Sequence, residues 1–272
     1  MTLSELCEKI GLQEELSSDV LTFAAAFDFS AVADLLERYK TSPAFNDITA
    51  ELQNRLGDDP RGVKILACFL WQAVRVKAWY DEERIGEDVY IATFRWFTRF
   101  IDETRQKTGR VIFRPWWTGR QIGLHMFRLG ELEYEFMFAS DDPFVNVHIP
   151  SGADLSEEPL KQSLAMVKTF INDHFPAYRD KEIRCTSWLL CDELLPVLSP
   201  ASKIRTFRSF FDLTPTGSRS TGFVGWLYMT DNITDHFEDL PETTSLQRYM
   251  KQRLLQGHVP ETLRGVLKGA YR

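Results

Sequence analysis

The sequence predicts an α+β protein, in which a helical N-terminal part is followed by a mixed sheet flanked by helices. The spacing of apolar residues changes near Gly109, from the intervals of three and four that are typical of helices to the alternation that is typical of strands. Beyond Gly109, strand-like and helix-like segments are interspersed. Because 272 residues allow two modest domains, we predict a helical domain over residues 1–109 and a sheet domain over residues 110–272.

The strongest helical patterns of the first part run through residues 65–74 and 89–106. In the earlier pattern, Leu66 and Phe69 share one apolar face with residues at helical spacing. The later pattern is expected to end at Gly109, because glycine readily adopts the left-handed conformation that closes a helix.

Two extended segments are expected next, over residues 118–127 and 129–138, with Leu129-Gly130 as a tight connection. The second segment alternates apolar and acidic residues: Leu132, Tyr134, Phe136 and Phe138 against Glu131, Glu133 and Glu135. This pattern predicts a strand with one buried face and one solvated acidic face.

The stretch around His148 organises the predicted sheet domain. Apolar and polar residues alternate over residues 145–149, which predicts a strand. Pro150 and Gly152 are expected to end that strand, and a helix is expected over residues 159–173. Backbone N–H groups at the start of such a helix can meet a ligand, and His148 precedes them directly. The residues alone indicate a candidate site here without specifying a reaction.

The remaining elements follow the same reasoning. We expect a strand over residues 182–189, a helix that Ser199-Pro200 begins and whose apolar stripe is Ile204, Phe207 and Phe211, a flexible loop over residues 214–218, a strand over residues 222–229, and a closing helix over residues 246–255.

Composition narrows the class of protein. The 39 acidic and 32 basic residues give a net charge of -7, which disfavours nucleic acid and anionic membranes as partners. No apolar run approaches the roughly 20 residues of a membrane helix, and the first residues lack a signal-peptide pattern. The four cysteines have no spacing typical of disulfides or zinc. We therefore expect a cytoplasmic protein without a metal.

Four stretches of the C-terminal part carry a resemblance: His148-Ile149-Pro150-Ser151-Gly152, Cys185-Thr186-Ser187-Trp188-Leu189-Leu190, Ser202-Lys203-Ile204-Arg205-Thr206-Phe207 and Thr244-Ser245-Leu246-Gln247-Arg248, with Gly257 after the last. With these stretches, the C-terminal part resembles the GNAT-like C-terminal domain of a family of bacterial acyltransferase-domain proteins, and the N-terminal helices are similar to the domain that precedes it there.

The resemblance implies an N-acyltransferase that uses acyl-coenzyme A as co-substrate and needs no metal. In such a fold the thioester lies between two strands that splay apart, here residues 145–149 and 183–188, and the pyrophosphate meets the loop after the first strand. The residues that this implies at the cofactor are Val147, Ile149, Ser151, Gly152, Ser187, Trp188, Lys203 and Arg205. Direct transfer also needs a base for the amine and an acid for the leaving thiolate.

Two departures from the resemblance concern the phosphate loop and the acid. In place of the glycine-rich loop the chain has residues 151–159, in which Asp154, Glu157 and Glu158 are expected to repel phosphate. An ordinary capped helix fits this loop as well as cofactor binding does. The tyrosine that often serves as acid is replaced by Phe210.

His148 is the first candidate for the base, since histidine suits proton transfer near neutrality. A histidine bonded to a neighbouring loop is an equal alternative. Glu135 is a second candidate to activate a water, although a solvated acidic face explains it as well. Tyr228 is the nearest replacement acid, or else a half-buried aromatic residue.

The function that the sequence favours is transfer of an acyl group from coenzyme A to an amine. The alternative, from another class, is a catalytically silent GNAT-like module that binds a small ligand or a protein partner. A hydrolase has little support, because the chain has no Gly-x-Ser-x-Gly elbow. The residues specify neither the acyl length, nor the acceptor, nor an oligomeric state.

Overall fold

The computed structural model describes residues 1–271 and divides into two compact units. Unit 1 comprises Met1–Leu129 and Tyr134–Pro143, and unit 2 comprises Gly130–Glu133 and Phe144–Arg272. The expected helix end at Gly109 is confirmed, since this residue caps the preceding helix with a φ of 70°. The domain boundary placed there stays a prediction.

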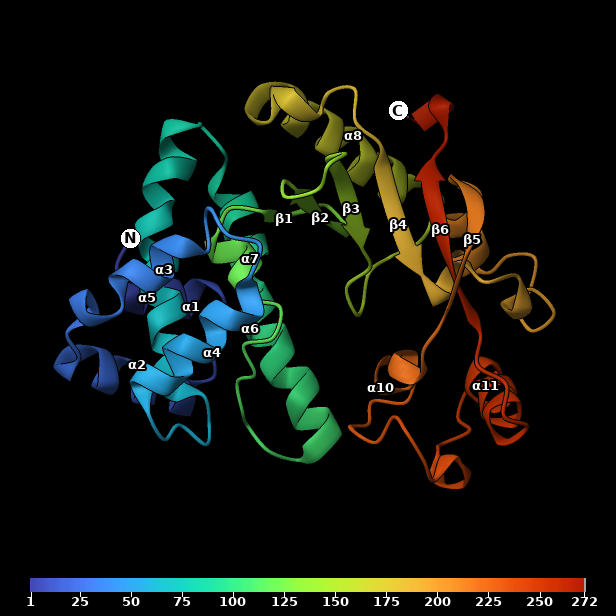
Figure 1. The fold of residues 1–272 in the computed structure, drawn as a ribbon, viewed down its shortest axis with the longest axis horizontal. Coiled ribbons are helices and arrows are strands. Elements are labelled where there is room, and N and C mark those ends of the chain that lie inside the picture. Colours follow the sequence, from blue (N-terminus) through green and yellow to red (C-terminus); the bar gives the residue numbers. More distant parts are fainter. Residues whose placement is uncertain (272) are drawn as a thin grey trace. The chain divides into compact units, whose positions relative to one another are not determined.

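Unit 1 is built around one buried helix. Its helices are α1 (Leu3–Lys9), α2 (Glu14–Ala26), α3 (Ala33–Arg38), α4 (Phe45–Leu56), α5 (Val63–Glu82), α6 (Glu87–Thr108) and α7 (Gly119–Ile122), with a 3-10 turn η1 (Phe29–Ala31) (Figure 1). Each residue from Ile65 to Leu70 is buried, so α5 is apolar on all sides. The other six helices all contact it. A helix of this kind is stable only when neighbours cover its whole circumference.

The segment 118–127 was expected to be extended, and this expectation was wrong. It contains α7, and the strand β1 begins only at Met126 (Met126–Leu129). A Cβ built on Gly119 would lie 2.4 Å from the Tyr39 ring, so the segment reaches its neighbour only through a glycine. The apolar run looked like a strand because short runs do not distinguish the two periods.

The hairpin connection at Leu129-Gly130 is confirmed, and strand β2 (Leu132–Met137) follows it. The solvated acidic face of this strand was a wrong prediction, because Glu133 and Glu135 are each only 4% exposed. Glu135 forms an ion pair with a neighbouring arginine, and such a partner is what permits burial of a carboxylate.

The sheet has six strands in the order β1-β2-β3-β4-β6-β5 (Figure 1). The strands of unit 2 are β3 (Phe144–His148), β4 (Ile183–Ser187), β5 (Phe211–Arg219) and β6 (Glu261–Leu267). β3 is parallel to β4, whereas β6 is antiparallel to both β4 and β5. The mixed sheet after a helical region confirms the predicted fold class.

The helices of unit 2 are α8 (Glu157–His174), α9 (Lys203–Ser209), α10 (Val224–Leu227) and α11 (Ser245–Leu255), joined by 3-10 turns η2 (Pro176–Tyr178), η3 (Trp188–Leu190), η4 (Asp192–Leu194), η5 (Thr221–Phe223), η6 (Phe237–Asp239) and η7 (Gly269–Tyr271). Helix α8 and the closing helix α11 confirm their predictions. Ser163 of α8 is fully buried, and its hydroxyl accepts a hydrogen bond of 3.2 Å from the Leu132 N–H.

Three other expectations for unit 2 were wrong. Helix α9 begins at Lys203 and not at Ser199-Pro200, and Phe211 belongs to β5. The expected loop over residues 214–218 is part of β5, because β6 pairs with it around a bulge. The expected strand over residues 222–229 forms η5 and α10, because its apolar residues pack into a local cluster.

The structure describes the state of the cysteines and the apolar character of the helices. All four cysteines are buried free thiols, in agreement with the absence of disulfide spacing. Within residues 1–271, no helix combines the length and the apolar character that crossing a bilayer requires.

Candidate functional site

The two parallel strands of unit 2 pair at their beginnings and not at their ends. The register joins Val145 to Ile183 and Asn146 to Arg184, and the Val145 N–H donates to the Glu182 carbonyl over 2.9 Å. It does not extend to the last residues of either strand, whereas β4 stays paired with β6 as far as Ser187. Residues at the carboxyl ends of β3 and β4 therefore flank an opening in the hydrogen-bond ladder (Figure 1).

His148 is the last residue of β3 and stands at this opening. Its imidazole is half-buried, and its Nε2 lies 3.2 Å from the side-chain nitrogen of Asn146, two residues earlier on the same strand face. Since an amide N–H donates, Nε2 is the accepting nitrogen in this pair. Val147 is buried between these two polar residues, and Ile149 is half-buried just beyond the strand. A base at this position would use the nitrogen that now accepts from Asn146, so a substrate amine would have to displace that hydrogen bond.

Two backbone N–H groups of the loop after β3 already have hydrogen-bond acceptors, one in the loop and one in the connection between β1 and β2. Gly152 turns the chain with a φ of 78°, and the Ala153 N–H donates to the Pro150 carbonyl. The Asp154 N–H donates to the Glu131 carboxylate over 2.8 Å. Ser151 and Gly152 themselves are exposed at the tip of the turn.

Positive charge from two helices meets the acids of this loop. Lys203, the first residue of α9, lies with its Nζ 2.8 Å from an Asp154 carboxylate oxygen. This bond, followed by bonds from Ser156, lowers the pKa of Asp154 to about 2. In α8, Lys161 pairs with Glu157 over 2.7 Å. The acids that were expected to repel a phosphate are thus partly neutralised, and Lys203 lies at Asp154 in the loop after β3.

At the end of β4, Ser187 and Trp188 form a turn. The Ser187 hydroxyl oxygen accepts a hydrogen bond of 3.1 Å from the Leu189 N–H, which leaves its own hydrogen available to donate. The Trp188 ring lies 4.9 Å from the Phe223 ring, centre to centre. Both residues are partly exposed at the mouth of the opening between the strands.

The two arginines of α9 donate hydrogen bonds to backbone carbonyls and are only partly exposed to solvent. Arg205 donates to the carbonyls of Leu198 (3.0 Å) and Leu195 (2.5 Å), and Arg208 donates to the Leu190 carbonyl (2.6 Å). These bonds fix the segment that follows β4. Arg205 therefore supports that segment, while Lys203 is the basic residue of α9 that lies at the loop.

Tyr228 is nearly buried, and its hydroxyl donates to the Gln247 carbonyl over 2.7 Å. Burial raises the pKa of Tyr228 to about 12. It packs among apolar residues of α10 and α11. This environment is that of a structural anchor between two helices.

Substituting Tyr228 by phenylalanine is expected to cost about 1–2 kcal/mol of stability, because the Gln247 carbonyl loses its donor. Urea unfolding measures this cost. If Tyr228 has only this role, the variant keeps the wild-type turnover number; a fall of tenfold or more at full folding would indicate that the hydroxyl is the acid.

Glu135 belongs to unit 1, whereas His148 belongs to unit 2. Its Oε1 is 2.6 Å from the Nε of Arg120, whose guanidinium also lies over the Trp117 ring. His125 is half-buried nearby, and its ring stacks on Phe138 at 4.2 Å between centres. These residues make a buried polar cluster within unit 1.

The stability of unit 1 is expected to fall as the pH drops. Burial lowers the pKa of His125, so the folded chain favours the neutral ring while the unfolded chain takes up a proton below a pH of about 6.5. Stability is thus lost from that pH downward, through the lowered pKa. A His125→Gln variant, which keeps an N–H for the Tyr39 carbonyl, should show a shallower loss of Tm between pH 8 and pH 5.5 than the wild type; an identical slope would contradict the assignment.

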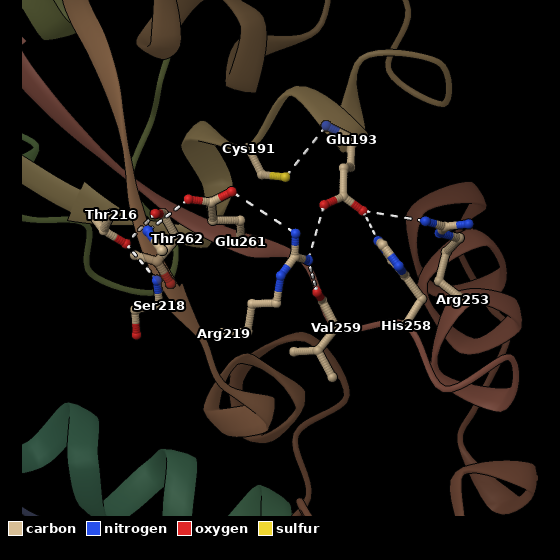
Figure 2. Close-up of polar contacts among 11 residues, drawn as sticks. Cys191, Glu193, Thr216, Ser218, Arg219, Arg253, His258, Val259, Glu261 and Thr262 are labelled. Atoms are coloured by element: carbon tan, nitrogen blue, oxygen red, sulfur yellow. Dashed lines mark hydrogen bonds and ion pairs between the residues drawn. The ribbon is translucent and has the colours of Figure 1, made fainter.

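A cluster of charged side chains that no sequence pattern indicated lies where β5 ends and β6 begins (Figure 2). Its centre is the Glu193 carboxylate, which contacts Arg219, Arg253 and His258. No local pattern marks these residues, because they come from four separate segments. Only the fold brings them together.

Comparison with known proteins gives a consistent result. A family described as the N-acyltransferase N-terminal domain matches residues 1–124, and one described as the GNAT-like C-terminal domain matches residues 126–267. No curated protein matches the sequence.

Solved acyltransferase structures share the fold. One, in complex with decanoyl-CoA and teicoplanin, has a TM-score of 0.74 and 21% identity, covering 97% of this chain and 87% of that one. A mutant acyltransferase with octanoyl-CoA has a TM-score of 0.75 and 21% identity, covering 97% and 86%. A third, with decanoyl-CoA, has a TM-score of 0.75 and 22% identity, covering 97% and 86%. With both family matches, the chain belongs to the family that joins an N-acyltransferase N-terminal domain to a GNAT-like C-terminal domain.

Proposed function

We propose that this protein transfers an acyl group from acyl-coenzyme A to an amine. The observation that carries the proposal is the opening between the carboxyl ends of β3 and β4, which leaves backbone groups of two adjacent parallel strands without each other as partners. A thioester can fill that opening, because its pantetheine amides can replace the missing ladder bonds. The similar acyltransferase structures hold decanoyl-CoA or octanoyl-CoA, which supports the same class of donor here.

The residues around the opening supply the chemistry. The amine nitrogen attacks the thioester carbonyl carbon, a C–N bond forms and the C–S bond breaks. His148 takes the proton that the amine loses, and the thiolate takes up a proton as it leaves. Val147, Ile149, Ser187 and Trp188 border the thioester in this arrangement. Ser187 has a hydroxyl hydrogen to offer the leaving group.

The phosphates are proposed to lie at the turn after β3. Ser151 and Gly152 are exposed there, and Lys203 supplies positive charge at Asp154 of the same loop. A phosphate would compete with Asp154 for the Lys203 ammonium, which is a charge-assisted contact of ordinary strength. Arg205 then acts by fixing the segment after β4.

The acceptor is proposed to be a primary amine on a small molecule. One similar structure contains teicoplanin together with decanoyl-CoA, which makes teicoplanin a sensible probe besides simpler amines. The protein is proposed to work in the cytoplasm of a bacterium, where acyl-coenzyme A is present.

A thermal-shift and thiol-release experiment tests the proposal. Decanoyl-CoA at 100 times its Kd should stabilise the chain by about 2.7 kcal/mol, and free coenzyme A should appear only when an amine is added. The probes are butylamine, glucosamine and teicoplanin. A Lys203→Gln variant should weaken decanoyl-CoA binding, whereas the matched Lys251→Gln variant on α11 should not.

The outcomes separate the two functions left by the sequence. Binding without thiol release for any amine would favour a silent module. The absence of a shift with decanoyl-CoA, octanoyl-CoA and acetyl-CoA would reject the proposal.

A further inference from the structure

A long connection leaves the sheet of unit 2 at one point and returns beside it. Arg219 and Glu261 are partners at the end of the β5–β6 ladder, and residues 220–260, here called the excursion, lie between them. The excursion carries α10 and α11 (Figure 1). Because β6 runs antiparallel to β4, with Leu263 opposite Ser187, the excursion stands at the end of the sheet where β3 and β4 separate.

The excursion packs against the segment that follows β4, residues 188–198. Phe223, Val224 and Met250 of the excursion share an apolar cluster with Cys191 and Leu194 of that segment. On its other side the segment is held by the backbone bonds from Arg205 and Arg208. It is thus fixed from two directions, and only one of them is the excursion.

A carboxylate of the segment, that of Glu193, makes polar contacts with the excursion (Figure 2). Glu193 contacts Arg219 at 3.4 Å, where the chain leaves the sheet, and Arg253 of α11 at 3.4 Å. Its other close partner is the His258 Nε2. Burial by itself would raise the pKa of Glu193, but the bonds from His258 and Arg253 lower it below its usual value. The carboxylate is therefore charged near neutrality, and only 25% of its side chain is exposed.

The neighbouring groups reinforce these contacts. Arg219 also pairs with Glu261 at 3.9 Å and donates to the Val259 carbonyl, while Glu261 accepts from the Gly217 N–H over 2.7 Å. The Glu193 N–H donates to the Cys191 sulfur over 3.3 Å. The charged groups that face Glu193 are thus two arginines and one histidine, and one further carboxylate balances the first arginine.

We propose that Glu193 is a positioning residue that fixes the excursion against residues 188–198, and so holds one wall of the acceptor site beside the open strand ends. This inference rests on the proposed acyl transfer. The acceptor must approach the thioester carbonyl at the carboxyl ends of β3 and β4. Residues 188–198 and the excursion stand at that end of the sheet. Apart from Trp188, the residues proposed to contact acyl-coenzyme A lie outside residues 188–198 and the excursion, so we expect its Kd to be set mainly by groups that Glu193 does not hold.

The test uses the full chain with Glu193→Gln, which keeps the shape and removes the charge. Hydrogen exchange should speed up in residues 188–198 and 220–260 and stay unchanged in α8. The Michaelis constant for the amine should rise by about tenfold, while the Kd for decanoyl-CoA stays at its wild-type value. Glu242→Gln is the matched control, since it breaks another ion pair of the excursion, with Lys251 at 2.9 Å, and should leave all three quantities unchanged.

A second variant guards against a merely catalytic explanation. His258→Gln retains an N–H donor for Glu193, so it should keep wild-type exchange and kinetics. Loss of turnover in this variant with wild-type exchange would assign His258 a role in the chemical step and overturn the positioning role of its partner.

Other results also decide the matter. Glu193→Gln with wild-type exchange, or with faster exchange and an unchanged amine Michaelis constant, would overturn the inference. Equal weakening of decanoyl-CoA and amine would do so as well. A wild-type chain that neither binds decanoyl-CoA nor releases coenzyme A would reject the proposed function, and the exchange measurement would then decide alone whether Glu193 fixes the excursion.

Discussion

Replacing His148 by glutamine is expected to lower kcat/KM for amine acylation by about 10²–10⁴-fold, the usual contribution of a positioned general base. Glutamine has a similar reach and can still meet the Asn146 amide, 3.2 Å from the present ring nitrogen, so the strand end should remain in place. The loss then reports proton removal from the amine and not a change of fold. The initial rate of coenzyme A release from decanoyl-CoA measures this loss of activity.

Turnover with the donor saturating separates a base from a binding residue. Turnover should fall in the His148→Gln variant, because no group then takes the proton of the amine, and this loss should appear at a fixed pH with the donor saturating. The Kd for decanoyl-CoA is the control and should not change. Equal activity of the two proteins with a strongly nucleophilic amine at pH 8 would exclude His148 as the base.

Replacing Arg120 by methionine is expected to destabilise the fold by about 3–5 kcal/mol, because it leaves the Glu135 carboxylate buried without its ion-pair partner. The two side chains are 19% and 6% exposed, so water does little to replace the lost contact. The guanidinium also covers the rings of Trp117 and Phe45, at 4.2 and 5.0 Å from their centres. Methionine retains some of that apolar contact, which isolates the charge effect.

A double variant, Arg120→Met with Glu135→Leu, should recover most of the lost stability, since apolar replacement of a whole buried pair is often nearly neutral. Urea unfolding of the single and double variants measures the coupling between the two sites. If Glu135 has no part in catalysis, the double variant should also keep wild-type turnover. A stable double variant with abolished turnover would return Glu135 to the list of candidate bases.

Much of the fold follows from local patterns. Helices α5 and α6, the strand that ends at His148 and the helix α8 after it are all set by apolar spacing and by the turn residues Pro150 and Gly152. The residues of the strand opening were predictable for the same reason, since they follow recognisable strand ends. Local periodicity suffices wherever an element buries one regular face.

Several features of the site depend on residues distant in sequence. Lys203 neutralises Asp154 from 49 positions away, and Glu193 meets His258 from 65 positions away. The sign of the charge at the loop after β3 therefore could not be judged from that loop alone. Burial of Glu135 likewise depends on Arg120, which lies within the segment 118–127 that was expected to be extended and is in part the helix α7.

By itself, the sequence determined which stretches bury an apolar face, and through them the order of helices and strands around His148. Tertiary structure alone decided that residues 214–218 belong to an edge strand and that residues 221–227 form the helical turns η5 and α10. It also decided that the Glu193 carboxylate contacts side chains from three other places in the chain at the end of the sheet. The physical reason is that strand pairing and these ion pairs are stabilised by partners that are remote in the chain. A helical or alternating pattern, by contrast, can be recognised from residues only a few positions apart.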